Sequence, residues 1–377
     1  MDNVKIAVEL HGHQPFWQPR NIIEQISGEC YDPIFSLVEE IDGFCFTVNT
    51  NLCLLEHLEK YRLDVLEKFK RMVQAKKLEL VASTAHHPIM PLIPESVQIM
   101  QIEEDLRKKE ERFGIKHTCQ GFFLPEMAFS ANIVELLKSY KYRWTVIDDV
   151  PFGAHYGKNS VPFNKIVSLK GFKVFMRSNY WSNMISSGKF SFWDIKNMME
   201  SQLPNWTGNV PAYIIIAMDI ETFGHHHHHL IDMFLRPMLK EWAGNKIVSI
   251  ESLIPDFQER KVHYLPDGSW STSIEDIERN NPYPLWSGFS RNRYFLWKLV
   301  NTALEHLEQA PEDCLKITTS CHWWWISRSG NEPDFMKKGA ELAMDILRKY
   351  GTQEEKASVQ ECYDKLMKVT KVFVNND

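Results

Sequence analysis

One stretch of the sequence, residues 213–229 (YIIIAMDIETFGHHHHH), constrains the fold more than any other. Its first six residues are apolar on both alternating faces and rich in β-branched side chains, which is typical of a parallel strand buried on both sides. Asp219 and Glu221 follow at the carboxyl end of that strand, where parallel sheets and α/β barrels gather ligands and catalytic groups. Two acids can also simply begin a solvated loop, so the pattern gains weight only if it recurs.

Short apolar segments that end in polar side chains do recur along the chain, at His11 and His13, at His86 and at Glu126. The predicted strands are residues 4–10, 44–48, 78–82, 121–124, 144–147, 165–169, 173–177, 213–218 and 246–250. The predicted helices among them are residues 33–41, 52–76, 95–113, 133–140 and 192–199. Because strands and helices alternate in this way, the sequence predicts an α/β fold in which helices surround a closed or nearly closed parallel sheet, a (β/α) barrel.

A turn signal at Pro266, Asp267 and Gly268 marks a change in the pattern. Beyond it, apolar residues recur with helical spacing over residues 294–307, 335–350 and 353–373. We therefore expect two domains, a catalytic barrel-type domain at residues 1–265 and a C-terminal helical region at residues 266–377 that packs on it.

Charge and composition exclude several classes of partner. A net charge of −6 and the lack of any Lys/Arg-rich run disfavour nucleic-acid binding. No stretch reaches the 18 apolar residues of a membrane span, and the start MDNVKIAVEL is not a signal peptide, so we expect a cytoplasmic protein without a membrane partner. Seven scattered cysteines without a C-x-x-C pair predict reduced thiols. An uncharged substrate fits this profile, and an aromatic fraction of 12% suits a protein that stacks rings against sugars.

Four short motifs occur in order along the chain: HGHQP at 11–15, STAHHPIMPL at 83–92, GFFLPEMAFS at 121–130 and AMDIETFGHHH at 217–227. Together they resemble the motifs of glycoside hydrolase family 57, which contains α-amylases, 4-α-glucanotransferases, amylopullulanases and glucan branching enzymes. The resemblance implies a seven-stranded, incomplete (β/α)7 barrel followed by helices, retention of anomeric configuration and an α-glucan substrate. SCHWWW at 320–325 departs from the family's fifth motif, which usually places an Asp before or near a Trp.

The resemblance also implies roles for single residues. Glu126 matches the catalytic nucleophile and Asp219 the general acid/base, while His13 and His86 match positions in the first two motifs. The full set of expected substrate-binding residues is His11, His13, His86, Glu221, His225, Trp17, Trp181, Trp270, His322 and Trp323. We expect no cofactor and no metal among them.

The acidic residues can be compared with the requirements of retaining glycoside transfer. Retaining glycoside transfer needs one ionised carboxylate and one protonated carboxyl roughly 5–5.5 Å apart. Acids at the ends of different parallel strands can meet in this way across a barrel mouth. Asp219 would need its pKa raised by burial or by the nearby charge of Glu126. Glu221 faces the same way as Asp219 by strand parity and is a rival for the acid role.

Two other classes of protein are compatible with the same residues. The histidines at the strand ends and the run at 225–229 could bind a metal, as in a metal-dependent carbohydrate deacetylase. A non-catalytic sugar-binding protein could keep the same barrel. In the family it resembles, the glycosyl-enzyme intermediate can pass to water or to a sugar hydroxyl. Because about 110 residues after the barrel are few for a branching enzyme, we expect α-amylase-like hydrolysis of α-1,4-glucan or maltooligosaccharides rather than 4-α-glucanotransfer or branching.

Overall fold

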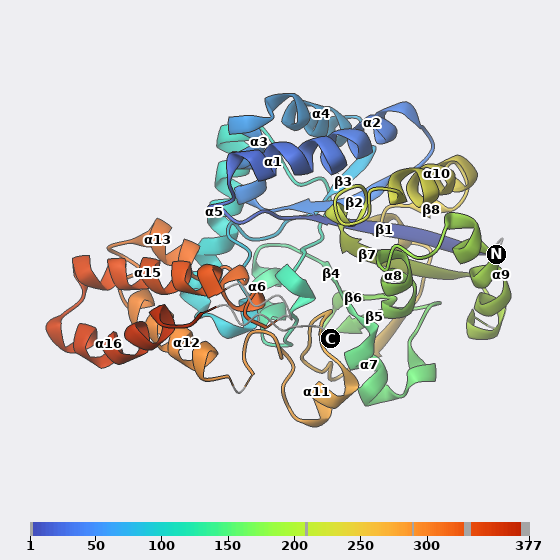
Figure 1. The fold of residues 1–377 in the computed structure, drawn as a ribbon. Coiled ribbons are helices and arrows are strands. Elements are labelled where there is room, and N and C mark those ends of the chain that lie inside the picture. The colour runs from blue at the N-terminus through green and yellow to red at the C-terminus, as the bar shows by residue number, and fades with distance from the viewer. Residues whose placement is uncertain (1–2, 208–209, 289, 328–332, 371–377) are drawn as a thin grey trace, which may run out of the picture.

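The computed structural model describes residues 3–207, 210–288, 290–327 and 333–370. Strand β1 crosses the molecule from the N-terminus towards the C-terminal helices, and the other strands flank it (Figure 1). The strands are β1 (Val4–Gly12), β2 (Phe46–Thr50), β3 (Leu78–Leu80), β4 (Trp144–Asp148), β5 (Ile166–Leu169), β6 (Phe172–Arg177), β7 (Ala212–Asp219), β8 (Ile247–Val248) and β9 (Glu259–Val262).

Seven parallel strand positions form a closed ring. β3, β2, β1, β7 and β6 pair in that order, and β4 pairs with β6. Two parallel bridges, between Ala82 and Phe122 and between Gly121 and Trp144, join β3 to β4 and close the ring. The predicted (β/α)7 barrel is therefore confirmed, although the expected strand at residues 121–124 is present only as these bridging residues.

Strands β5, β8 and β9 lie outside the ring. β5 runs antiparallel to β6 and parallel to β9, while β8 pairs with Ile6 and Ala7 in the first half of β1. The last predicted strand, at 246–250, is present only as the short strand β8. β9 has few apolar side chains, so its sequence has no hydrophobic pattern from which a strand could be predicted.

The barrel is built on β-strands that bury both faces, as the pattern of β7 predicts. Ile214 and Ile216 of β7 belong to the cluster between the barrel and the outer helices. Tyr213, Ile215 and Ala217 belong to a separate cluster of inward-facing residues. Both clusters exclude water, so the alternating apolar residues of this strand stabilise the barrel from inside and outside.

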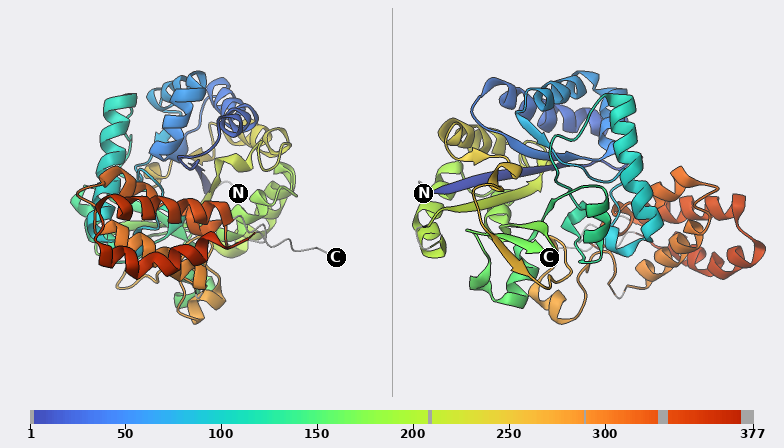
Figure 2. Two further views of the ribbon diagram at one scale, coloured as in Figure 1. Left: turned by 60° about the vertical axis from the view of Figure 1, so that its left-hand side comes forward. Right: turned by 180° about the vertical axis from the view of Figure 1, so that it is seen from behind.

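Helices cover the outside of the ring and continue beyond it (Figures 1 and 2). Those interleaved with the strands are α1 (Arg20–Ile26), α2 (Asp32–Glu40), α3 (Leu52–Tyr61), α4 (Leu63–Gln74), α5 (Glu95–Phe113), α6 (Ile133–Ser139), α7 (Asp149–Tyr156), α8 (Asn179–Ser186), α9 (Phe192–Thr207) and α10 (Arg236–Trp242). The predicted helix at 52–76 is interrupted at Arg62, whose φ of −146° and ψ of 59° are not helical. The apolar residues that were predicted to form one face of a single helix are therefore divided between α3 and α4.

The C-terminal helices lie at the carboxyl end of the barrel strands (Figures 1 and 2). They are α11 (Ile274–Glu278), α12 (Arg291–Leu304), α13 (Pro311–Ile317), α14 (Cys321–Trp324), α15 (Pro333–Tyr350) and α16 (Gln353–Met367). α12, α15 and α16 pack on one another, and α13 packs on α5. An antiparallel bridge between Phe129 and Gly268 also ties the start of this region to the barrel.

The division into two domains at 265/266 stays a prediction. The helix expected at 353–373 ends at Met367, and its residues 371–373 lie outside the described residues. Among the described helices, none combines the length and the apolar character that a membrane crossing requires.

Candidate active site

A cavity of about 350 Å³ opens at the carboxyl ends of β1, β6 and β7. Its volume lies near the lower limit of pockets that bind small molecules. Of the residues predicted for the site, it brings together His11, His13, Glu126, Asp219, Glu221 and Trp270. It also contains Gln14, His87, Arg177 and Cys321, to which the sequence analysis assigned no role, and further His226, Trp324 and Trp325.

Glu126 enters the cavity from a tight turn that follows residues 121–124. Glu126 and Met127 both have left-handed backbones, with φ of 58° and 48°. Such conformations cost about 1–3 kcal/mol each for residues other than glycine and cluster at functional sites. Met127 is fully buried and Pro125 precedes the turn, so packing of the neighbouring residues maintains it.

Both carboxylate oxygens of Glu126 have neighbours from the C-terminal region. The indole Nε1 of Trp270 donates to Oε2 at 2.7 Å, and the hydroxyl of Ser320 lies 3.4 Å from Oε1. His87 Nδ1 is 4.0 Å from the same Oε1. The residue is only 8% exposed, so the charge of its carboxylate is balanced by directed hydrogen-bond donors rather than by bulk water.

Asp219 ends β7 and lies in register with His11 of the adjacent β1. It is half-buried and lines the same cavity as Glu126. The two carboxylates thus reach one cavity from different strand ends. Two carboxyl groups placed in this way can act on one ligand from two sides of the barrel mouth.

Glu221 lies two residues beyond Asp219 and is almost fully buried. Its Oε1 accepts hydrogen bonds from Tyr31 Oη at 2.5 Å and from Gln14 Nε2 at 3.0 Å. Burial, followed by the charge of Asp219, raises the pKa of Glu221 to about 7. A carboxyl group that holds its proton near neutral pH is therefore present beside Asp219.

Three imidazoles stack along one side of the cavity. The rings of His13 and His87 are 4.1 Å apart and nearly parallel, and His11 Nε2 lies 2.9 Å from His87 Nε2. Burial lowers the pKa of His11 to about 4 and those of His13 and His87 well below the usual value. The three rings are consequently neutral at neutral pH and act as hydrogen-bond donors and acceptors, not as cations.

His86 lies outside the cavity, where its Nδ1 is 3.1 Å from the thiol of Cys53. The next residue, His87, has a left-handed backbone with φ of 56° and lines the cavity instead. The kink reverses the order in which the two side chains would project from an extended segment. Adjacent histidines in a sequence do not show which one turns inward.

Several of the aromatic and histidine residues predicted to bind substrate pack elsewhere. Trp181 is fully buried in the core and packs on Trp206, and Trp323 is fully buried and stacks on Trp297 at 4.1 Å. His322 is buried and stacks on Trp17 at 4.9 Å, and neither lines the cavity.

Trp324 and Trp325, which follow Trp323 directly, face the cavity. His225 pairs with Glu29, its Nδ1 lying 2.7 Å from Oε2, while His226 reaches the cavity.

Arg177, at the end of β6, supplies a fixed positive charge beside the cavity. It forms a buried ion pair with Asp148 at 2.6 Å and donates to Asn183 at 2.8 Å. Its guanidinium lies 5.9 Å from the centre of the Trp270 ring. Arg177 is a charged residue at the end of the predicted strand 173–177. That position was the signal from which its place at the site could have been predicted.

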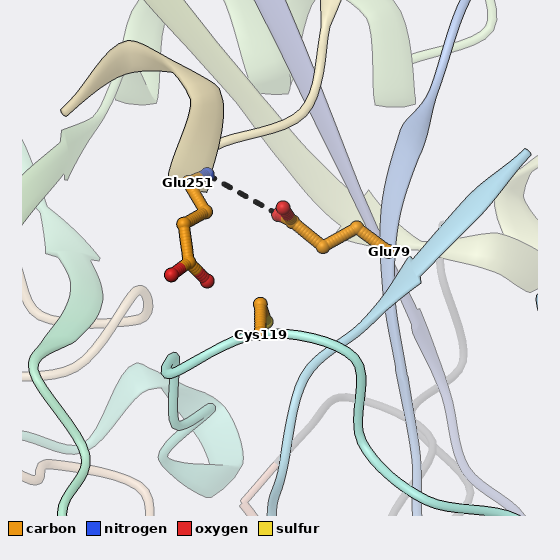
Figure 3. A group of neighbouring side chains, drawn as sticks. All are labelled: Glu79, Cys119 and Glu251. Carbon is orange, nitrogen blue, oxygen red and sulfur yellow. Dashed lines mark hydrogen bonds between the residues drawn. The ribbon is translucent and has the colours of Figure 1, made fainter. Parts of the chain in front are cut away.

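Figure 3 shows a separate group with metal-ligand character, formed by Glu79, Cys119 and Glu251, whose ligand atoms lie within 4.8 Å of one another. The backbone N–H of Glu251 donates to Glu79 at 3.3 Å, and the backbone N–H of Gln120 donates to Glu251 at 2.7 Å. None of the three lines the cavity. Within the described part of the chain, the cavity histidines do not form a group of this kind.

Comparison with known proteins points to the same family as the four motifs. The family model described as Glycosyl hydrolase family 57 matches residues 7–266. A protein of Methanocaldococcus jannaschii, named as a candidate alpha-amylase, is 25% identical over 295 residues, which are 74% of this chain and 61% of that protein. The chain therefore spans less than two thirds of this relative's length.

Solved structures share the fold. The 4-alpha-glucanotransferase from Thermococcus litoralis superposes with a TM-score of 0.74 at 19% identity, over 93% of this chain and 60% of that one. The GH57-type branching enzyme from Pyrococcus horikoshii superposes with a TM-score of 0.70 at 16% identity, over 99% and 98%. Because the family model matches more than half of the sequence, the chain belongs to glycosyl hydrolase family 57.

Proposed function

We propose that the protein acts on α-1,4-glucan or maltooligosaccharides by double displacement, with Glu126 as nucleophile and Asp219 as general acid/base. One observation carries the proposal: the two carboxylates at the matching motif positions line a single cavity at the barrel mouth. Family membership and the α-glucan-active relatives support the substrate class.

In the first step, the Glu126 carboxylate attacks the anomeric carbon while Asp219 gives its proton to the leaving glycosidic oxygen. A covalent glycosyl-enzyme forms as the C–O bond to the leaving sugar breaks. In the second step, Asp219 takes a proton from water, whose oxygen attacks the same carbon and releases Glu126. The Trp270 indole and the Ser320 hydroxyl hold the attacking carboxylate in place.

We propose hydrolysis as the second step, in which water attacks the glycosyl-enzyme. A sugar hydroxyl that took the place of water in the same part of the cavity would give transfer. Chain length does not separate the activities, since the superposition with the Pyrococcus horikoshii branching enzyme covers nearly all of both chains. Trp324 and Trp325 offer aromatic faces to the sugar rings.

The test is to incubate the protein with maltooligosaccharides and with glycogen and to resolve all products. Only shorter chains are expected; longer linear chains would show 4-α-glucanotransfer, and new α-1,6 links would show branching. Glu126→Gln should abolish nearly all turnover. Glu251→Gln, a carboxylate lost outside the cavity, is the matched control and should stay active. If Glu126→Gln keeps full turnover, the assignment of Glu126 fails.

A further inference from the structure

Glu126 is the end point of a continuous series of buried side chains that begins in the barrel. Ser320 Oγ lies 3.4 Å from Glu126 Oε1 and 2.8 Å from His87 Nδ1. His87 Nε2 lies 2.9 Å from His11 Nε2, and His11 Nδ1 lies 2.5 Å from the amide of Asn49. Ser320 and Asn49 are completely buried, and the two histidines are at most 4% exposed.

The backbone holds the members of this series in place. Asn49 and His11 are register neighbours on β2 and β1. The backbone N–H of Ser320 donates to the carbonyl of His87 at 2.8 Å, next to an antiparallel bridge between residues 88 and 319. The ring of Phe123 stacks on His11 at 4.6 Å. Side chains fixed in this way lose little entropy when they form their hydrogen bonds.

We propose that Ser320, His87, His11 and Asn49 form a positioning relay that fixes the carboxylate of Glu126 and favours its ionised form. The proposal rests on the proposed function, in which Glu126 is the nucleophile, and it extends that function to residues that need not touch the substrate. Asn49 does not line the cavity. Its influence on Glu126 passes through the other three residues.

The proton order of the relay follows from hydrogen-bond counting. His11 and His87 are neutral, because burial lowers the pKa of both, so each ring has one N–H. If Ser320 donates to Glu126, His87 Nδ1–H must donate to Ser320. His11 Nε2–H must then donate to His87, and His11 Nδ1 must accept a hydrogen bond. The NH₂ group of the Asn49 amide is the donor that can complete this order.

Two unsatisfied buried groups support this orientation of Asn49. The structure places Oδ1 of Asn49 towards His11, and its Nδ2, which has no partner of ordinary hydrogen-bond geometry, faces Glu9 and lowers the pKa of that carboxyl against the larger effect of burial. A half-turn of the amide keeps its shape and gives Nδ2 an acceptor in His11. The oxygen then faces Glu9, whose two carboxyl oxygens also lack partners and whose pKa is raised to about 8, first by burial and then by Glu79. Protonated Glu9 can donate to that oxygen.

Other groups facing Glu126 keep their state when the relay is changed. Burial raises the pKa of Cys321 to about 12, so the thiol is neutral. Trp270 does not titrate, and the guanidinium of Arg177 lies beyond its ring. Asp219 and Glu221 are the other acids of the cavity, and the hydrogen bonds of Glu221 run to Tyr31 and Gln14, away from the relay. A change in the titration of Glu126 on altering Ser320 therefore reports the relay.

The test is a titration of the Glu126 side-chain carboxyl by ¹³C NMR in the full chain labelled at glutamate, with the signal assigned by its absence in Glu126→Gln. Ser320→Ala removes the donor to the charged form, so the titration midpoint should rise by about half to one pH unit. Ser320→Thr keeps the hydroxyl and should restore the original midpoint. Thermal unfolding of each variant checks the fold.

His87→Asn is the second arm, because asparagine tolerates the left-handed backbone at this position. Its amide can still reach Ser320 but not His11, so the midpoint should rise by less than in Ser320→Ala. In a relay, His87→Asn should add nothing further in the Ser320→Ala background. An unchanged midpoint in Ser320→Ala, or fully additive shifts, would overturn the relay. Turnover of Glu126→Gln separately tests the nucleophile, so the two failures are distinguishable.

Discussion

Trp270 donates its indole N–H to Oε2 of Glu126 at 2.7 Å, although 144 positions separate the two residues in the chain. The backbone N–H of Trp270 also donates to the carbonyl of Glu126 at 3.2 Å. Residues from beyond the predicted barrel therefore hold both the side chain and the strained turn of Glu126. The chain after residue 265 completes the site, in addition to packing on the barrel.

Trp270→Phe should lower kcat/KM by about 10- to 100-fold. Phenylalanine keeps most of the ring but removes a hydrogen bond to a charged group, which is worth about 1.5–3 kcal/mol. The measurement is the steady-state rate on maltooligosaccharides. Trp193→Phe, at a tryptophan that is 50% exposed, is the control and should leave the rate unchanged. An equal rate for Trp270→Phe would show that this bond does not support Glu126.

Glu221 should make the protein less stable as pH rises from about 5 to 8. Its pKa is raised from 4.5 to about 7, mainly by burial, so within this window the folded state keeps a proton that the unfolded state has released. Stability is lost as pH rises, by about 3 kcal/mol in total. Glu221→Gln removes this dependence and can still accept from Tyr31 and Gln14.

Urea unfolding at several pH values measures the effect. The unfolding free energy of Glu221→Gln relative to the wild type should increase between pH 5 and pH 8. Two curves that stay parallel over this range would contradict the raised pKa.

The alternation of apolar strands with helices was enough to predict a closed or nearly closed parallel sheet surrounded by helices, because each strand buries two faces and each helix one. The number of seven strands was implied only by the resemblance to family 57. The interruption at Arg62 and the antiparallel turn between β5 and β6 depend on single backbone conformations. Such conformations leave no periodic signal. The helices after residue 265 were predicted from their spacing, but the contacts of Trp270 and Ser320, which lie between those helices, with Glu126 were not.

Substitution of Trp325 should affect substrate binding, whereas substitution of Trp323 should affect stability. Trp325→Ala removes an aromatic face from the cavity, so KM should rise by about fivefold, as expected for a contact of about 1 kcal/mol. Trp323→Ala leaves a hole in the core and should cost about 3–5 kcal/mol of stability. Michaelis kinetics and thermal unfolding of both variants separate the roles. A higher KM in the folded Trp323→Ala protein with an unchanged KM in Trp325→Ala would reverse the assignment.

A chelator should leave turnover of α-glucan unchanged. The proposed steps use two carboxylates and water, and the group of the described residues with metal-ligand spacing, Glu79, Cys119 and Glu251, lies outside the cavity. The measurement is the rate after dialysis against EDTA, with acetate release from an acetylated sugar assayed in parallel. Loss of activity on chelation together with acetate release would favour a metal-dependent deacetylase.

The site was predictable where side-chain direction follows strand parity. Asp219 and His11 end regular strands, and both reach the cavity. His86 was expected there from its match to the second motif, whereas His87, which has a left-handed backbone, lines the cavity. Ser320 carried no signal because its role depends on contact between segments more than 190 positions apart.

Azide rescue of the two carboxylate variants tests the central claim most directly. In Glu126→Gln, azide should replace the missing nucleophile and give the β-glycosyl azide from an activated α-glucoside. In Asp219→Asn, azide should attack the glycosyl-enzyme and give the α-glycosyl azide. Proton NMR of the products distinguishes the two anomers. The same anomer from both variants, or an α-azide from Glu126→Gln, would contradict the assignment of Glu126 as nucleophile and Asp219 as acid/base.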